Sequence, residues 1–114
     1  MTLPEYTDGV LELYRIEEDT LKDYPEERLR ATNERIWYRE LSVYDTTRAK
    51  LAAASVEVTM KLAIPQYKKI NSKCVCMIDG KQHEIYNVAH VTTKDGFKES
   101  ELTLKTPAYD REVI

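Results

Sequence analysis

Both cysteines of the chain and one of its two histidines lie in a single stretch, CVCMIDGKQHEIYNV, at residues 74–88. Cys74, Cys76 and His83 are residue types that zinc prefers as ligands. A cysteine beside a histidine is also a pair that nucleophilic catalysis uses. The stretch therefore raises two hypotheses, a metal site and a Cys76–His83 dyad.

A hairpin accounts for the same residues without either chemistry. Asp79-Gly80 between apolar runs is a strong signal for a two-residue hairpin turn. With this turn at the tip, Cys76 lies opposite His83, and Cys74 lies on the same face. The apolar side chains expected on that face are Ile78, Ile85 and Ala89. The full register pairs Ile78 with Lys81, Met77 with Gln82, Cys76 with His83 and Cys74 with Ile85.

The spacing also argues against metal or catalysis. The cysteines follow a C-x-C spacing instead of C-x₂₋₄-C, and His90 is expected on the opposite face if the register continues. A dyad inside an apolar stripe has no substrate cleft, whereas free cysteine is commonly buried as a small hydrophobe. Two cysteines this close on one strand have poor geometry for a disulfide. We predict reduced, buried thiols, with no metal, no cofactor and no catalytic residue.

Composition narrows the class of protein further. The 114 residues include 17 Lys and Arg against 20 Asp and Glu, a net charge of −3. This charge argues against a protein that wraps nucleic acid generally, which needs a dense basic face, and leaves room for local basic patches. No apolar run approaches the roughly 18 residues of a membrane span. MTLPEYTDG lacks the features of a signal peptide. We expect an intracellular, non-enzymatic protein without membrane contact, folded as one domain over 1–114 with flexible tails at 1–8 and 107–114.

Period-two alternation predicts the strands. Apolar residues at 56, 58, 60, 62 and 64 alternate with polar ones, and Pro65 ends this strand. In a second strand, 35–44, Trp37, Leu41 and Val43 share a predicted apolar face that Arg39 interrupts. Further strands are predicted over 10–16, 83–93 and 99–106, with turns at Asp8-Gly9 and Lys94-Asp95-Gly96.

Two segments do not follow the strand pattern. Residues 45–54 are rich in alanine after Asp45 and Thr46, which predicts a helix of two to three turns. Residues 17–33 are highly charged and contain Pro25, which favours a long loop or a helical turn at 25–30. This segment is either a solvated excursion or an arm that contacts a partner. Six antiparallel strands with one short helix predict a small β-barrel or rolled sheet.

Five segments from residue 36 onward form a pattern of predicted strands, a helix and turns that can be compared with known families. They are IWYRELSV, TTRAKLAAAS, VEVTMKLAIPQY, DGKQHEIYNV and ELTLK. This order resembles the small head–tail connector proteins of long-tailed bacteriophages, the head-closure or head–tail adaptor family. The resemblance covers residues 35–106 and, more loosely, 9–16. His83 stands where the hairpin pattern has an aromatic residue.

The resemblance implies a six-stranded, antiparallel, barrel-like fold in a virion structural protein of a phage or prophage. Such proteins form a homo-oligomeric ring at the head–tail interface, after assembly in the host cytoplasm. The ring contacts portal or adaptor and tail proteins and helps close the channel through which DNA passes. The implied contact segments are 17–33 and 45–55, with the tail 108–114 as a further contact.

A nucleic-acid-binding barrel of the OB type is the alternative. That class needs clustered lysines with exposed aromatic rings on one face of the barrel. Lys61, Lys68 and Lys69 near Tyr67 are the residues that suggest it.

Overall fold

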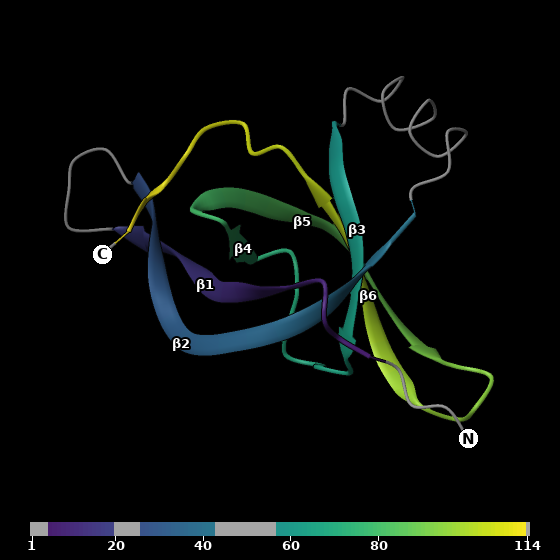
Figure 1. The fold of residues 1–114 in the computed structure, drawn as a ribbon. Coiled ribbons are helices and arrows are strands. Elements are labelled where there is room, and N and C mark those ends of the chain that lie inside the picture. Colours follow the sequence, from purple (N-terminus) through teal and green to yellow (C-terminus); the bar gives the residue numbers. More distant parts are fainter. Residues whose placement is uncertain (1–4, 20–25, 43–56, 114) are drawn as a thin grey trace.

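Within residues 5–19, 26–42 and 57–113, which the computed structural model describes, every regular element is a β-strand (Figure 1). These residues contain no helix of the length and apolarity that a membrane crossing requires. The helix predicted over 45–54 lies outside the described residues. The strands are β1 (Gly9–Asp19), β2 (Glu26–Leu41), β3 (Val58–Pro65), β4 (Cys74–Ile78), β5 (Lys81–Thr92), β6 (Lys98–Lys105) and β7 (Glu112–Val113).

Six of these strands form one closed antiparallel ring. The order is β1-β4-β5-β6-β3-β2, and β2 pairs with β1 to close it. The short β7 lies outside the ring and pairs in parallel with β2. The predicted fold class, mainly β with a small six-stranded antiparallel barrel-like arrangement, is confirmed.

Apolar side chains from every strand of the ring meet in one core. In β3, Val58, Leu62 and Ile64 are buried and Met60 packs against the core, as the alternation predicts. Ile70, in the loop after β3, joins the same core. The other buried members of the core are Leu11, Leu13, Tyr38, Cys74, Cys76, Ile78, Ile85, Leu102 and Leu104.

The β4–β5 hairpin has the predicted register. Cys76 pairs with His83, and Ile78 pairs with Lys81 beside the turn. Asp79 and Gly80 have φ of 52° and 76°, the positive values that a type I′ turn needs at both central residues. The local turn chemistry therefore fixes which side chains share a face.

A bulge in β5 shifts the second half of that strand. The register with β6 changes between Ile85 and Asn87, and an extra residue reverses the faces that follow it. Val88, instead of the predicted Ala89, consequently packs against the core. The prediction that His90 faces away is also wrong, because His90 pairs with the buried Ser100 and its Nδ1 lies 2.8 Å from Ser100 Oγ.

The apolar face predicted for β2 is wrong. Trp37 is 59% exposed, whereas its neighbour Tyr38 is 6% exposed and belongs to the core. Arg39 shares the face of Trp37 and forms an ion pair with Glu99 of β6. The charged residue that interrupted the predicted face therefore belongs to the outer face, and the core takes the alternate set.

The loop predicted over 17–33 is also wrong for the residues that are described. Residues 17–19 continue β1, residues 26–33 belong to β2, and the two segments pair directly. Cross-strand pairs of opposite charge, such as Arg30 with Glu17, stabilise this charged ladder. Residues 20–25 lie outside the described part of the chain.

Candidate interaction site

A two-stranded arm extends from the ring. The pairing of β1 with its neighbour β4 ends at Arg15, which is opposite Cys74. One further hydrogen bond follows, from the Ile16 amide to the Lys73 carbonyl at 2.8 Å. Beyond this point β1 pairs with β2 alone among the described strands. We call residues 16–19 and 26–31 the arm.

The arm is ordered by its own contacts. Arg30 Nε lies 2.8 Å from Glu17 Oε1, and Leu29 is fully buried although it is not a member of the main core. At the base, Thr32 Oγ1 donates to the Leu13 carbonyl at 2.8 Å, beside Asn33 with its φ of 62°. Thr32 and Asn33 occupy the irregularity where the β1–β2 register shifts.

The C-terminal residues 107–113, here called the strap, join the arm to the ring. Arg111 Nη1 lies 2.7 Å from Glu84 of β5, and its Nη2 lies 3.0 Å from Glu27 of the arm. The Gln82 side chain bonds both the amide and the carbonyl of Arg111. Burial by itself lowers the pKa of the Arg111 guanidinium, but the hydrogen bonds to Glu84 and Glu27 outweigh this effect, so the pKa is raised. The Tyr109 ring lies 5.1 Å from its guanidinium carbon, at cation–π distance.

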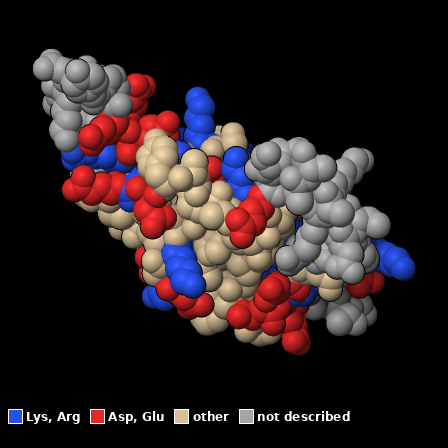
Figure 2. Space-filling model, turned by 90° about the horizontal axis from the view of Figure 1, so that it is seen from above, with Lys and Arg blue, Asp and Glu red and all other residues tan. Residues whose placement is uncertain are grey.

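Acidic side chains surround this junction. A groove of about 500 Å³ opens between the arm and the strap. The side chain of Arg111 is only 9% exposed, so the accessible charge of the groove is negative. Figure 2 shows Asp and Glu side chains, with some Lys and Arg, at this end of the molecule, which is at the upper left of the view. The residues that line the groove are Glu18, Glu26, Glu27, Tyr109, Asp110, Arg111 and Glu112.

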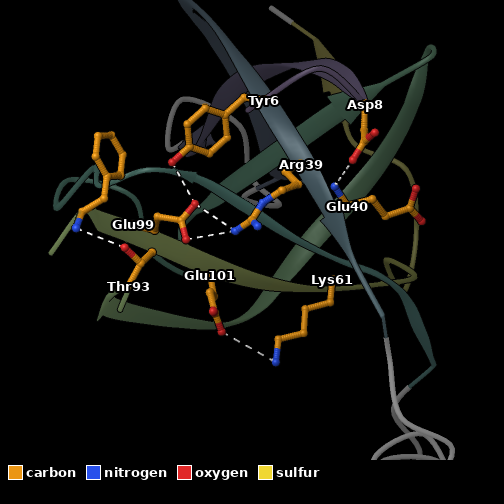
Figure 3. Close-up of polar contacts among 9 residues, drawn as sticks. Tyr6, Asp8, Arg39, Glu40, Lys61, Thr93, Glu99 and Glu101 are labelled. Atoms are coloured by element: carbon orange, nitrogen blue, oxygen red, sulfur yellow. Dashed lines mark hydrogen bonds and ion pairs between the residues drawn. The ribbon is translucent and has the colours of Figure 1, made fainter. Parts of the chain in front are cut away.

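A second polar cluster lies on the outer face of the ring (Figure 3). The side chain of Glu99 is 2% exposed, and Arg39 Nη2 lies 3.0 Å from both of its carboxylate oxygens. Tyr6 donates its hydroxyl hydrogen to Glu99 Oε2 at 2.8 Å. Burial and this hydrogen bond raise the pKa of Tyr6. The cluster fastens the segment before β1 across β6 and β2.

Of the three residues that suggest metal binding or catalysis, the two cysteines lie in the core, whereas His83 lies outside the core cluster. Cys74 and Cys76 are free thiols that are 1% and 0% exposed. His83 is partly buried, and its Nδ1 lies 2.9 Å from Thr59 Oγ1. Among the described residues, no group of three His, Cys, Asp or Glu side chains is arranged to hold a metal ion.

Replacing Cys76 by serine is expected to destabilise the fold by about 1–3 kcal/mol, because a buried hydroxyl loses water without gaining a partner. Burial and the neighbouring Cys74 raise the pKa of Cys76 to about 12, so its thiol should react with a disulfide reagent only after unfolding. Cys74→Ser is the matched control, since Asn71 Oδ1 lies 3.9 Å from Cys74 Sγ and offers an acceptor. Urea unfolding measures both, and equal losses for the two variants would contradict this account.

Acidification is expected to weaken the fold through His83. Burial and the nearby Lys81 lower the pKa of His83, so its contribution to stability is complete above the unfolded pKa of about 6.5 and is lost as the pH falls below that value. His83→Gln should show a smaller loss of stability than the wild type between about pH 7.5 and about pH 5. Urea unfolding at the two pH values checks this, and identical pH dependence would refute it.

Of the residues that suggest nucleic-acid binding, Lys61 is paired with a carboxylate and Tyr67 is partly buried. Lys61 lies 3.8 Å from Glu101 on β6. Tyr67 packs against the core, and its pKa is raised chiefly by a hydrogen bond to Glu34. Lys68 and Lys69 are exposed beside it.

Several residues of the arm, the strap and the outer face carried no signal in the sequence. Arg111 lies 27 residues from Glu84 and 29 from Gln82 along the chain, and only the fold brings it to these two residues of β5. Trp37 is the large apolar residue most exposed among those described, at 59%.

Comparison with protein-family models and with curated proteins finds no match for the chain.

Proposed function

We propose that the protein is a structural component of the head–tail connector of a long-tailed phage or prophage. Its copies form a ring that joins the portal to the tail and helps close the DNA channel. The partners are further copies of the chain together with portal or adaptor and tail proteins. The protein is assembled in the host cytoplasm and resides at the head–tail interface of the virion.

The observation that carries this proposal is the arm that extends from the closed six-stranded sheet of each subunit. A closed sheet is a self-contained body with few exposed edges. The arm continues outward from it, ordered by Arg30 with Glu17 and joined to β5 through Arg111. An ordered, charged extension suits contact with neighbouring subunits, because it meets them with little further loss of conformational entropy.

The charge of the chain is compatible with DNA that passes without binding. The net charge is −3, and the groove beside the arm is lined mainly by carboxylates. Binding to DNA depends on lysine and arginine that displace counterions from phosphates. An acidic surface therefore supports a channel role over a nucleic-acid-binding role.

Deleting the gene tests the proposal. We expect filled heads that lose their DNA and tails that stay unattached, seen by electron microscopy of the lysate. The wild-type chain supplied in trans should restore joined particles, whereas Glu18→Lys with Glu112→Lys at the arm groove should not. Glu5→Lys with Glu57→Lys makes the same charge change at exposed positions outside that groove and should restore them. Normal particles after deletion would overturn the proposal.

A further inference from the structure

The second half of β5 has a partner strand on one side only. β6 pairs with β5 as far as Thr92, opposite Lys98, whereas β4 pairs with it only to Glu84, opposite Val75. No other strand in the described part of the chain pairs with residues 86–92. Among the described residues, one row of backbone donors and acceptors along this segment is therefore not used by any strand, and such a row can pair with another strand.

This free edge carries no charged side chain and no proline, and its one irregularity is the bulge at its start, between Ile85 and Asn87. Residues 85–93, IYNVAHVTT, contain no Asp, Glu, Lys or Arg and no Gly or Pro, in a chain in which 32% of the residues are charged. Exposed edges in natural sheets are commonly protected by lysine, proline or other charged residues. The segment is instead rich in β-branched and aromatic residues, which favour strand pairing.

The side chains along the edge are only partly covered. Val88, Ala89 and Val91 are half-buried, and Tyr86 at the bulge is 43% exposed. Ala89 pairs with Glu101 and Val91 with Glu99 on the outer face of β6. A strand added at this edge would cover these side chains while it satisfied the free backbone groups.

We propose that two copies of the chain associate through this edge, with residues 86–92 of one copy antiparallel to the same residues of the other. In an antiparallel self-pairing, each side chain meets its own type or a nearby residue of the identical strand, so a charged edge would bring like charges together. The uncharged edge of β5 avoids that repulsion. Centred on Ala89, the pairing places Val88 opposite His90 and Asn87 opposite Val91. This inference goes beyond the proposed function and does not depend on it.

Charge placed at the centre of the pairing tests the dimer. Sedimentation equilibrium of the wild-type chain should show a monomer–dimer equilibrium. Ala89→Lys and Ala89→Glu should each weaken association at least about tenfold, because like charges then face one another. A mixture of the two variants should restore it. Thr103→Lys on β6 is the control, since Thr103 lies on the same outer face between two partner strands.

Cross-linking locates the contact. Cys74 and Cys76 are buried, so a cysteine introduced on the outer face is the accessible thiol. Ala89→Cys should form an intermolecular disulfide much faster than Thr103→Cys under mild oxidation. A wild-type chain that remains monomeric at the highest soluble concentration, equal weakening by Ala89→Lys and Thr103→Lys, or equal cross-linking rates would each overturn the inference. None of these results would affect the outcome of the gene deletion.

Discussion

Replacing Arg39 by methionine is expected to lower the free energy of unfolding by about 2–4 kcal/mol, because it leaves a buried carboxylate without its counter-ion. The side chain of Glu99 is 2% exposed, and Arg39 provides the positive charge that lies 3.0 Å from both of its oxygens. Tyr6 remains as a neutral donor. Urea unfolding measures the loss.

A double-mutant cycle separates the ion pair from simple packing. Glu99→Gln removes the buried charge, so Arg39→Met in that background should cost at least about 1 kcal/mol less than in the wild type. Arg39→Lys keeps the charge and should lie between the wild type and Arg39→Met. A loss below about 0.5 kcal/mol for Arg39→Met, as for an ordinary surface substitution, would show that the cluster does not stabilise the fold.

Gly9→Ala is expected to destabilise the ring where β1 closes onto β2, by about 1–3 kcal/mol for overpacking. A Cβ at Gly9 would lie 2.6 Å from Cζ of Tyr38 and 2.9 Å from its Cε1. Tyr38 is directly opposite Gly9 in the sheet and is 6% exposed, so its ring has little room to move. Thermal or urea unfolding measures the effect.

A smaller residue at position 38 should relieve this clash. In a Tyr38→Leu background, Gly9→Ala should cost much less than it does in the wild type. Gly96→Ala is the control, since its cost arises from a φ of 82° with nothing near its Cβ, and Tyr38→Leu should not change it. An equal cost of Gly9→Ala in both backgrounds would contradict the steric explanation.

The features that the sequence predicts well are those with local causes. Asp79-Gly80 determines the β4–β5 turn and hence the register of Cys76 with His83, because both central residues accept positive φ. The alternation of β3 likewise places Leu62 and Ile64 in the core. Together these local signals indicated a small antiparallel ring of strands.

The errors have distant causes. Arg39 and Glu99 are 60 residues apart, so nothing near β2 shows that Arg39 belongs to the outer face. The bulge before Asn87 reverses the faces of β5 without a local glycine. The segment of the arm is predicted as a loop because it is highly charged, and its strand structure depends on contacts that the sequence does not show: the pairing of β1 with β2, the buried Leu29 and the ion pair of Arg30 with Glu17.

The candidate site was less accessible to sequence analysis than the fold. The segments 17–33 and 108–114 were named as contacts by resemblance alone, whereas the structure brings parts of both together through Arg111 and Glu27. That junction depends on the closed ring, because Glu84 lies on β5 and Glu27 on β2. A charged residue near the end of a chain gives no sign of its partner in another strand.

Electron cryo-microscopy of the purified chain mixed with the portal protein encoded by the same genome tests the central claim most directly. The proposed function predicts a ring of added density at the tail-facing end of the portal, into which the six-stranded ring fits with its arms at the contacts between subunits. An unchanged portal, together with retention of the chain on single-stranded DNA at physiological salt, would contradict the connector role and favour a nucleic-acid-binding barrel.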